Sequence, residues 1–100
     1  MSTYPFRRAL ITGASAGIGE QFANILGNAG VPCVLVARRG DRLQELANRY
    51  AGFEVLEADL QSHAGVAAVA ARITTNTDPV DLVVNNAGFG SSGEIGRAHV

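Results

Sequence analysis

The sequence predicts an α/β fold in which helices alternate with the strands of a parallel sheet. Short apolar runs at residues 9–11, 34–36, 53–56 and 82–84 alternate with segments whose apolar residues recur at helical spacing. A helix between two strands forms a crossover connection, and such connections give parallel strands. Continuous runs of Val, Leu and Ile, without alternating polar residues, are typical of strands buried on both faces. We therefore expect the order β-α-β-α-β-α-β.

The first predicted helix lies between the strands at 9–11 and 34–36. Its apolar residues recur at i, i+4, i+7, i+8 and i+11, and this spacing predicts one buried face. The predicted face consists of Ile18, Phe22, Ile25, Leu26 and Ala29. Gly30 occupies the position at which a glycine commonly ends a helix.

Two further helices are expected before the fourth strand. Asp41 and Gln44 resemble a capping box at the start of the second helix, which extends to Tyr50 and is closed by Gly52. Ser62 is the expected cap of the third helix. Its predicted apolar stripe consists of Val66, Val69, Ala70 and Ile73.

Length and composition restrict the chain to one small domain. It has 100 residues, 47% of them hydrophobic, and a net charge of −1, so it can form a core and lacks the charge excess of nucleic-acid or polybasic membrane-binding proteins. Residues 1–6 show no signal-peptide pattern, and no apolar run approaches the length of about 20 residues that spans a bilayer. We expect a soluble cytoplasmic protein that binds neither nucleic acid nor membranes.

The single cysteine, Cys33, cannot form an internal disulfide. It lies next to a predicted buried strand, where a free cysteine behaves as a small apolar residue. The alternative is a reactive thiol, but the sequence shows no basic neighbour that would stabilise a thiolate.

A glycine-rich segment, TGASAGIG at residues 12–19, joins the first strand to the first helix. Glycine allows a sharp turn and the close approach of a ligand, and a helix N-terminus presents free N–H groups to an anion. This arrangement indicates a phosphate-bearing cofactor. The P-loop motif is excluded because it needs a lysine, and the spacing G-x-G-x-x-G is not matched. A glycine-rich turn without a ligand remains the structural alternative.

The predicted topology brings this segment close to a second one. With the strand order 3-2-1-4, the switch point lies between the first and fourth strands, and ligands bind outside the carboxyl ends of strands at such a point. The glycine-rich segment and residues 85–88 both follow strand ends there. The strand, glycine loop, helix and second strand together form the first βαβ unit of a dinucleotide-binding fold.

Three motifs resemble the short-chain dehydrogenase/reductase family. The G-x-x-x-G-x-G spacing of Gly13, Gly17 and Gly19 is similar to the cofactor loop of its single-domain branch. The sequence NNAG at 85–88 and the pair Asp59-Leu60 are similar to two further family motifs. The resemblance spans residues 10–93 and implies an incomplete Rossmann-type, doubly wound parallel sheet, as in an N-terminal fragment of a family member.

The resemblance assigns roles to individual residues. The backbone of the glycine loop is expected to line the adenosine phosphates and pyrophosphate. Asp59 is expected to accept from the adenine amino group, and Leu60 to donate its N–H or pack on the ring. Three residues after the fourth strand are expected to pass beside the riboses. These residues are Gly13, Ser15, Ala16, Gly17, Ile18, Gly19, Asp59, Leu60, Asn86, Ala87 and Gly88. Without the family, Asp59 would be a solvated strand-end carboxylate. Thr12 and Asn85 are expected to be structural.

The end of the second strand predicts a preference for NADP over NAD. An NAD site places a carboxylate there to bind the ribose 2′-hydroxyl, whereas this chain has Ala37 followed by Arg38 and Arg39. Arginine pairs with a 2′-phosphate through a bidentate, charge-assisted fork. Arg38 is the expected main contact, with help from Ser15 and Arg39. The alternative is that both arginines are solvated charges.

The family transfers hydride between a nicotinamide cofactor and a carbonyl or alcohol, using a serine and a Tyr-x-x-x-Lys pair. The chain has no lysine, so that pair is absent, and we assign neither a catalytic residue nor a metal site. We expect an NADP-dependent oxidoreductase as the full-length protein, an inactive fragment, and a homo-oligomer at full length. The alternative is a non-catalytic module that binds or senses NADP(H).

The last residues differ from the expected family pattern. Residues 95–100, IGRAHV, match one reading frame of a widely used sequencing-library adapter. We therefore expect residues 1–94 to be the cofactor-binding part of a Rossmann domain and residues 95–100 to be a non-native tail. A genuine loop followed by truncation is the alternative.

Overall fold

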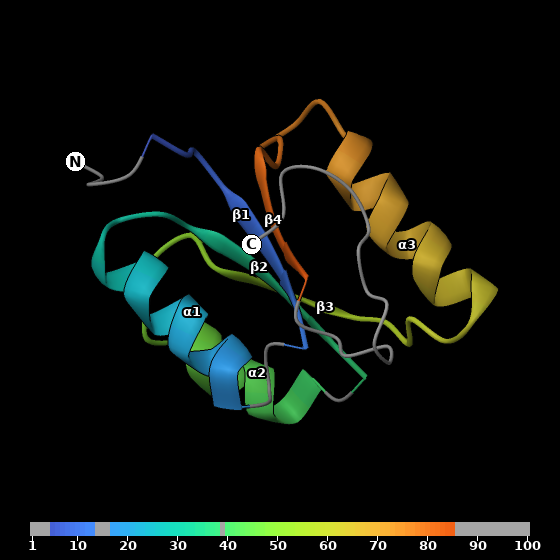
Figure 1. Cartoon of the computed structure of the whole chain (residues 1–100), viewed down its shortest axis with the longest axis horizontal. Coiled ribbons are helices and arrows are strands. Elements are labelled where there is room, and N and C mark those ends of the chain that lie inside the picture. The colour runs from blue at the N-terminus through green and yellow to red at the C-terminus, as the bar shows by residue number, and fades with distance from the viewer. Residues whose placement is uncertain (1–4, 14–16, 39, 86–100) are drawn as a thin grey trace.

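The computed structural model describes residues 5–13, 17–38 and 40–85, and within them strands and helices alternate as expected (Figure 1). The predicted tail at 95–100 lies outside these residues. The elements are β1 (Ala9–Thr12), α1 (Gly17–Asn28), β2 (Cys33–Ala37), α2 (Gly40–Ala47), β3 (Glu54–Glu57), α3 (His63–Thr74) and β4 (Leu82–Asn85).

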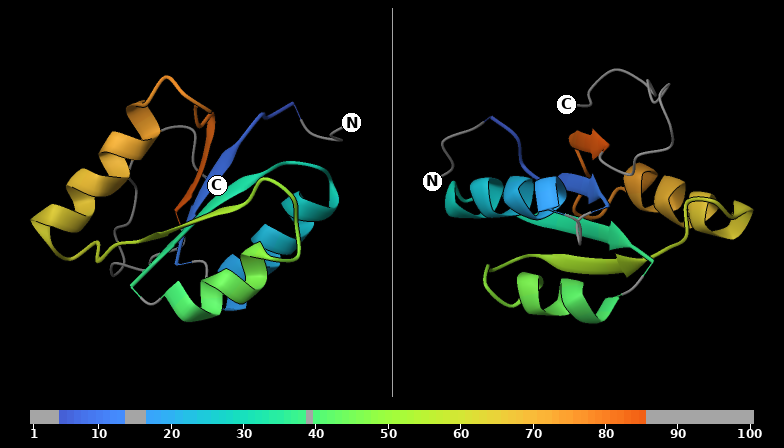
Figure 2. Two further views of the ribbon diagram at one scale, coloured as in Figure 1. Left: turned by 180° about the vertical axis from the view of Figure 1, so that it is seen from behind. Right: turned by 60° about the horizontal axis from the view of Figure 1, so that its bottom comes forward.

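The four strands form one parallel sheet in the order β3-β2-β1-β4, which confirms the predicted topology. Ala9 of β1 lies in register with Cys33 of β2 and with Leu82 of β4, so β1 is paired on both sides. Helices α1 and α2 cover one face of the sheet and α3 covers the other (Figures 1 and 2). The chain therefore changes face between β3 and β4, and the switch point lies between β1 and β4.

Each face of the sheet has its own hydrophobic core. On the first face, Ile11 and Leu35 pack with Leu26 of α1 and Leu43 of α2. On the second face, Leu10, Val34 and Val36 pack with Val69 of α3. β1 and β2 contribute alternate residues to the two cores, as expected of strands buried on both sides.

The predicted buried face of α1 is only partly correct. Ile18 and Ile25 are 63% and 53% exposed, whereas Gly19, Ala23 and Leu26 are buried. Two of these three buried residues are small. A residue whose side chain is absent or only a methyl group allows the helix to approach the sheet closely. Apolar periodicity favours the larger residues and therefore predicts the wrong rotation.

The other two helices also differ in detail from the predictions. Helix α2 begins at Gly40, one residue before the expected cap Asp41, and ends before Tyr50. In α3, Ser62 is the N-cap as predicted and accepts from the N–H of Gly65. Two residues of the expected stripe, Val66 and Ala70, are exposed, and only Val69 is fully buried. The helices of the described residues are too short and too polar to span a bilayer.

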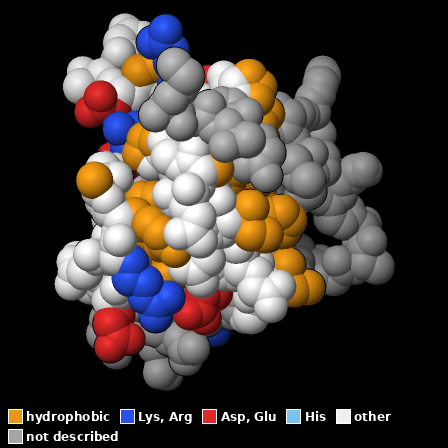
Figure 3. All heavy atoms as spheres, turned by 90° about the vertical axis from the view of Figure 1, so that its left-hand side faces the viewer, with side chains coloured by type: hydrophobic (Ala, Val, Ile, Leu, Met, Phe, Trp, Pro, Cys, Tyr) orange, Lys and Arg blue, Asp and Glu red, His pale blue; other side chains and the backbone are white. Residues whose placement is uncertain are grey.

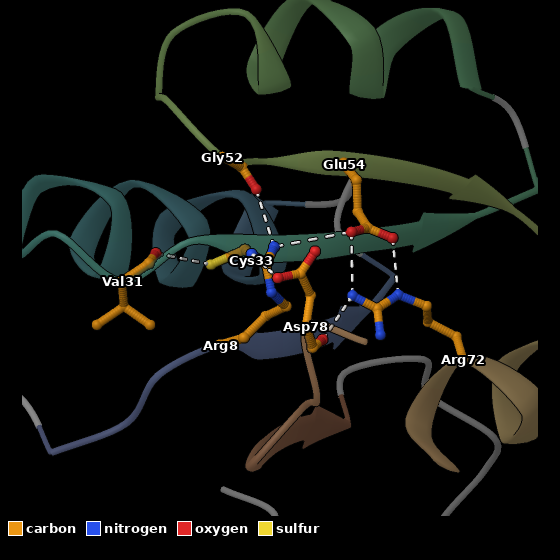
Figure 4. A network of polar contacts seen from close by, with 7 residues as sticks. All are labelled: Arg8, Val31, Cys33, Gly52, Glu54, Arg72 and Asp78. Atoms are coloured by element: carbon orange, nitrogen blue, oxygen red, sulfur yellow. Dashed lines mark hydrogen bonds and ion pairs between the residues drawn. The ribbon is translucent and has the colours of Figure 1, made fainter. Parts of the chain in front are cut away.

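Charged residues form a network at the amino end of the sheet (Figure 4). Arg72, near the end of α3, donates from Nε and Nη2 to the two carboxylate oxygens of Glu54, at 2.7 and 3.0 Å. Arg8 lies 3.7 Å from Glu54 and 3.9 Å from Asp78, and donates to the carbonyl of Gly52. The hydrogen bonds from Arg72 lower the pKa of the Glu54 carboxyl, although burial opposes them.

Cys33 lies beside this network and is fully buried. Burial raises the pKa of its thiol to about 12, although the charge of Arg8 lowers it. The expectation that no basic residue lies near the thiol is wrong, but burial outweighs the arginine and keeps the thiol protonated near neutral pH. This agrees with the apolar role predicted for Cys33.

Charges of both signs are also mixed on the outer surface. On the face shown in Figure 3, Arg side chains and Asp or Glu side chains both appear toward the top and toward the bottom, and exposed apolar side chains lie between these two charged regions. This face of the described part of the chain carries no extended basic patch.

Candidate functional site

The predicted site residues within the described ranges follow the carboxyl ends of the strands. Because all strands are parallel, these ends lie along one edge of the sheet (Figure 1). The last residues of β1 and β4, Thr12 and Asn85, are in register, as are Ala37 of β2 and Glu57 of β3. The turn after β1, Arg38 after β2 and Asp59 after β3 are therefore neighbours along this edge, which is where open α/β sheets bind ligands.

The turn from β1 to α1 opens with Gly13, whose φ of 63° lies in the left-handed region. A residue with a side chain is strained there, so the backbone conformation itself requires glycine. The turn leads to Gly17, the first residue of α1, and α1 then presents its N-terminal N–H groups at the carboxyl edge of the sheet.

Gly17 has a different environment from Gly27 and Gly65, two other helix glycines. A Cβ built on Gly17 meets no atom of the described residues within 4 Å, whereas a Cβ on Gly27 or Gly65 meets other atoms at less than 3 Å. The φ of Gly17 is also not among the positive values. Neither backbone conformation nor packing among the described residues requires glycine at this position. Within the described part of the chain, the space above Gly17 is open.

The side chains of Thr12 and Asn85 connect β1 to β4. The Thr12 hydroxyl donates to Oδ1 of Asn85 at 3.0 Å, and Thr12 is buried. This hydrogen bond agrees with the structural role expected of both residues. This hydrogen bond holds the two strand ends together at the switch point.

Asp59 lies in a tight turn between β3 and α3. Its Oδ1 accepts from the N–H of Gln61 at 2.9 Å, and its carbonyl accepts from the N–H and the hydroxyl of Ser62 at 3.0 and 2.9 Å. No donor from the described residues contacts the other carboxylate oxygen, Oδ2. Leu60 is half-buried and packs against the second core. The turn thus fixes the Asp59 backbone and leaves one carboxylate oxygen available.

The end of β2 places an exposed arginine beside this turn. Ala37 accepts from the N–H of Ala58 at 3.0 Å, which ties the ends of β2 and β3 together. Arg38 follows directly and is exposed. Among the ion pairs of the described residues, none involves Arg38.

The structure places part of the predicted site and leaves part undescribed. Residues at the carboxyl edge are Gly13, Gly17, Ile18, Gly19, Arg38, Asp59 and Leu60, of which Gly19 is buried. The predicted residues outside the described ranges are Ser15, Ala16, Arg39, Asn86, Ala87 and Gly88. The sequence reasoning missed Gly65, which lies against Asp59; a glycine three residues after a helix cap was the available signal.

Comparison with known proteins identifies relatives over nearly the whole chain. Residues 7–99 match the model of the short chain dehydrogenase family. An uncharacterized oxidoreductase of Mycobacterium tuberculosis H37Rv is 36% identical over 96 residues, covering 90% of this chain and 38% of that protein. A 3-oxoacyl-[acyl-carrier-protein] reductase of rhamnolipid biosynthesis from Pseudomonas aeruginosa is 36% identical over 85 residues, covering 82% of this chain and 33% of that protein.

Solved structures agree with these matches. A bulky-bulky ketone specific alcohol dehydrogenase from Comamonas testosteroni superposes with a TM-score of 0.78 at 38% identity, over 87% of this chain and 36% of that one. A short-chain dehydrogenase from Sphingobium yanoikuyae, solved in complex with NADPH, has a TM-score of 0.76 at 40% identity, over 88% of this chain and 36% of that one. The chain thus spans less than two fifths of the length of these relatives.

Proposed function

The chain belongs to the short-chain dehydrogenase family, and from this we propose that it is the NADP(H)-binding part of an oxidoreductase. The cofactor, when bound, carries a hydride to or from a carbonyl or alcohol substrate of the whole protein. The residues of this chain bind and orient the nucleotide. They lie at the switch point of the sheet, the usual ligand position in this architecture.

The observation that carries the proposal is the open space at Gly17. A glycine that neither backbone conformation nor packing requires is explained by a ligand that approaches the backbone closely. The N-terminus of α1 begins at this residue and offers free N–H groups and a partial positive charge. The pyrophosphate of a dinucleotide matches both features in size and charge.

The remaining contacts of the proposed site follow the same edge of the sheet. Oδ2 of Asp59 accepts from the adenine amino group, and the Leu60 N–H or its half-buried side chain meets the ring. Residues on either side of the described ranges complete the proposed site: Ser15 and Ala16 at the phosphates, and Asn86, Ala87 and Gly88 beside the riboses.

We also propose that the cofactor is NADP(H) and that Arg38 binds its 2′-phosphate, aided by Ser15 and Arg39. The support is the exposed position of Arg38 and the presence of Ala37, not a carboxylate, at the end of β2. One structural neighbour, the Sphingobium yanoikuyae enzyme, was solved with NADPH.

Calorimetric titration of the chain with NADPH tests the proposal, with Gly17→Ala as the decisive variant. The added methyl group occupies the open space, so we expect the Kd for NADPH to rise at least about tenfold. The melting temperature should stay the same or rise, because Ala favours a helix over Gly by up to about 1 kcal/mol.

The matched control is Asn28→Ala, at the exposed far end of the same helix, which should leave the Kd unchanged. Unchanged NADPH binding in Gly17→Ala would exclude this loop as the phosphate site. No NADPH binding by the unmodified, folded chain would refute the proposed function.

A further inference from the structure

Gly65, the third residue of α3, lies buried against the backbone of Asp59. We propose that Gly65 is a positioning residue: its lack of a side chain lets the first turn of α3 hold Asp59 where its carboxylate meets the adenine amino group. The inference rests on the proposed nucleotide site, and it adds a residue that none of the three family motifs contains.

The contact leaves no room for a side chain. A Cβ on Gly65 would lie 2.5 Å from the carbonyl carbon and 2.8 Å from the nitrogen of Asp59, and closer still to the carbonyl oxygen. These are backbone atoms, so no rotamer change can relieve the overlap. Either α3 or the turn at Asp59 must move to accept any other residue.

Hydrogen bonds determine which part moves. The Ser62 hydroxyl donates to the Asp59 carbonyl and accepts from the N–H of Gly65. These two hydrogen bonds connect the turn at Asp59 to the first turn of α3. On the other side of the turn, Ala58 is anchored to Ala37 of the sheet. Because Ala58 is fixed, displacement of the first turn of α3 falls on Asp59 and the residues that follow it.

The displacement matters because a hydrogen bond is sensitive to distance and angle. Oδ1 of Asp59 is engaged by Gln61, and Oδ2 is the oxygen proposed to accept from adenine. A shift of about 1 Å moves a donor–acceptor pair out of the range of a good hydrogen bond. Gly65→Ala is therefore expected to weaken recognition of the adenine amino group in particular.

Gly27 provides a matched control in the same chain. A Cβ on Gly27 would lie 2.7–2.8 Å from the ring of Tyr50, so Gly27→Ala also introduces an overlap within a packed region of the fold. This contact joins α1 to the segment after α2 and does not touch Asp59. A general loss of stability should therefore appear in both variants, and a loss of adenine recognition in Gly65→Ala alone.

The experiment measures the Kd of the chain for NADPH and for the analogue that carries hypoxanthine, which lacks the amino group of adenine. The readout is the ratio of the two constants. Partial unfolding weakens both apparent affinities by the same factor and cancels in the ratio. We expect the unmodified chain to prefer NADPH by about tenfold, the value of one hydrogen bond to a charged group.

Asp59→Ala and Gly65→Ala should reduce this preference to within about twofold of unity, while Gly27→Ala should retain it. If Gly65→Ala does not fold, Ser62→Ala, which removes both hydrogen bonds of the Ser62 hydroxyl without adding atoms, should still lower the preference.

Three results would overturn the inference, and they differ in whether the proposed nucleotide binding still holds. An unchanged preference in Gly65→Ala or, where that variant does not fold, in Ser62→Ala excludes the positioning role alone. An unchanged preference in Asp59→Ala shows that Asp59 does not contact the amino group, although nucleotide binding stands. Failure of the unmodified chain to bind either nucleotide removes the proposed function together with the inference.

Discussion

The two ends of the sheet satisfy their polar groups in different ways. At the amino end, Arg8 and Arg72 lie against the carboxylates of Glu54 and Asp78, so charges of both signs are paired within the chain (Figure 4). At the carboxyl end, Arg38 is exposed without an ion pair to the described residues, and Oδ2 of Asp59 has no donor among them.

The pairing of a polar group therefore indicates whether the group contributes to stability or to binding. Groups that are paired internally contribute to folding, whereas groups held in place without a partner are available to a ligand. We expect substitutions of internally paired groups to change the free energy of unfolding and substitutions of the unpaired groups at the carboxyl end to change nucleotide affinity. Each of the following experiments tests one side of that division.

Arg38→Ala gives the largest expected effect. It removes a charge-assisted hydrogen bond to the 2′-phosphate, so the Kd for NADPH should rise about 10- to 100-fold while the Kd for NADH stays the same. The melting temperature should not change, because the side chain is exposed. Calorimetric titration measures both constants, and Arg49→Ala, another exposed arginine, is the control. Equal affinity of the unmodified chain for NADPH and NADH would contradict the assignment.

Arg72→Met tests the amino end. It removes two bonds to Glu54 and one to the carbonyl of Asp78. We expect a loss of about 2 kcal/mol, below the roughly 3–5 kcal/mol of a fully buried pair, because the Glu54 side chain is 41% exposed. Arg72 Nη1 is buried without a partner in the described structure, and its removal offsets part of the loss.

Urea denaturation measures this loss, with Arg49→Met as a control expected to change stability by less than about 0.5 kcal/mol. The division between the two ends predicts that Arg72→Met retains its preference for NADPH over NADH. A changed preference would show that the network at the amino end also shapes the binding edge.

The topology could be predicted from the sequence because few strand orders fit the pattern of alternating strands and helices. Alternating strands and helices with right-handed crossovers, together with a glycine loop after the first strand, leave the order β3-β2-β1-β4. The rotation of α1 could not be predicted in the same way. Gly19 and Ala23 face the sheet while Ile18 and Ile25 are exposed, and apolar periodicity does not favour a face of small residues.

The candidate site shows the same division. Gly13 and Asp59 could be placed at strand ends because motif and strand are adjacent in the sequence. The contact of Gly65 with Asp59 depends on how closely α3 approaches the turn, which is a property of tertiary packing. The pairing of Arg72 with Glu54 likewise joins residues 18 apart, and nothing in their local sequence indicates it.

Thr12→Val tests the side-chain hydrogen bond between the carboxyl ends of β1 and β4. It removes the hydroxyl donor to Asn85 and leaves a part-buried amide oxygen without it, so we expect a loss of about 1 kcal/mol. Thermal denaturation measures the change, and Thr12→Ser, which keeps the hydroxyl, should lose less. If Thr12→Val is as stable as the unmodified chain, this bond contributes nothing to holding the strand ends together.

Acid titration gives the smallest expected effect and identifies Glu54 as its source. The bonds from Arg72 lower the pKa of Glu54 in the folded state below its ordinary value of 4.5. A lowered pKa contributes stability that is present above about pH 4.5 and is lost as the pH falls through the folded-state value.

We expect Glu54→Gln to be less stable near pH 7, by less than about 1 kcal/mol because the carboxylate is partly exposed. The difference from the unmodified chain should shrink as the pH falls through the folded-state pKa of Glu54, below which both side chains are neutral. Urea denaturation at pH values from 7 downward measures this difference in the free energy of unfolding. A difference that does not change with pH would mean that Glu54 acts through packing and not through its charge.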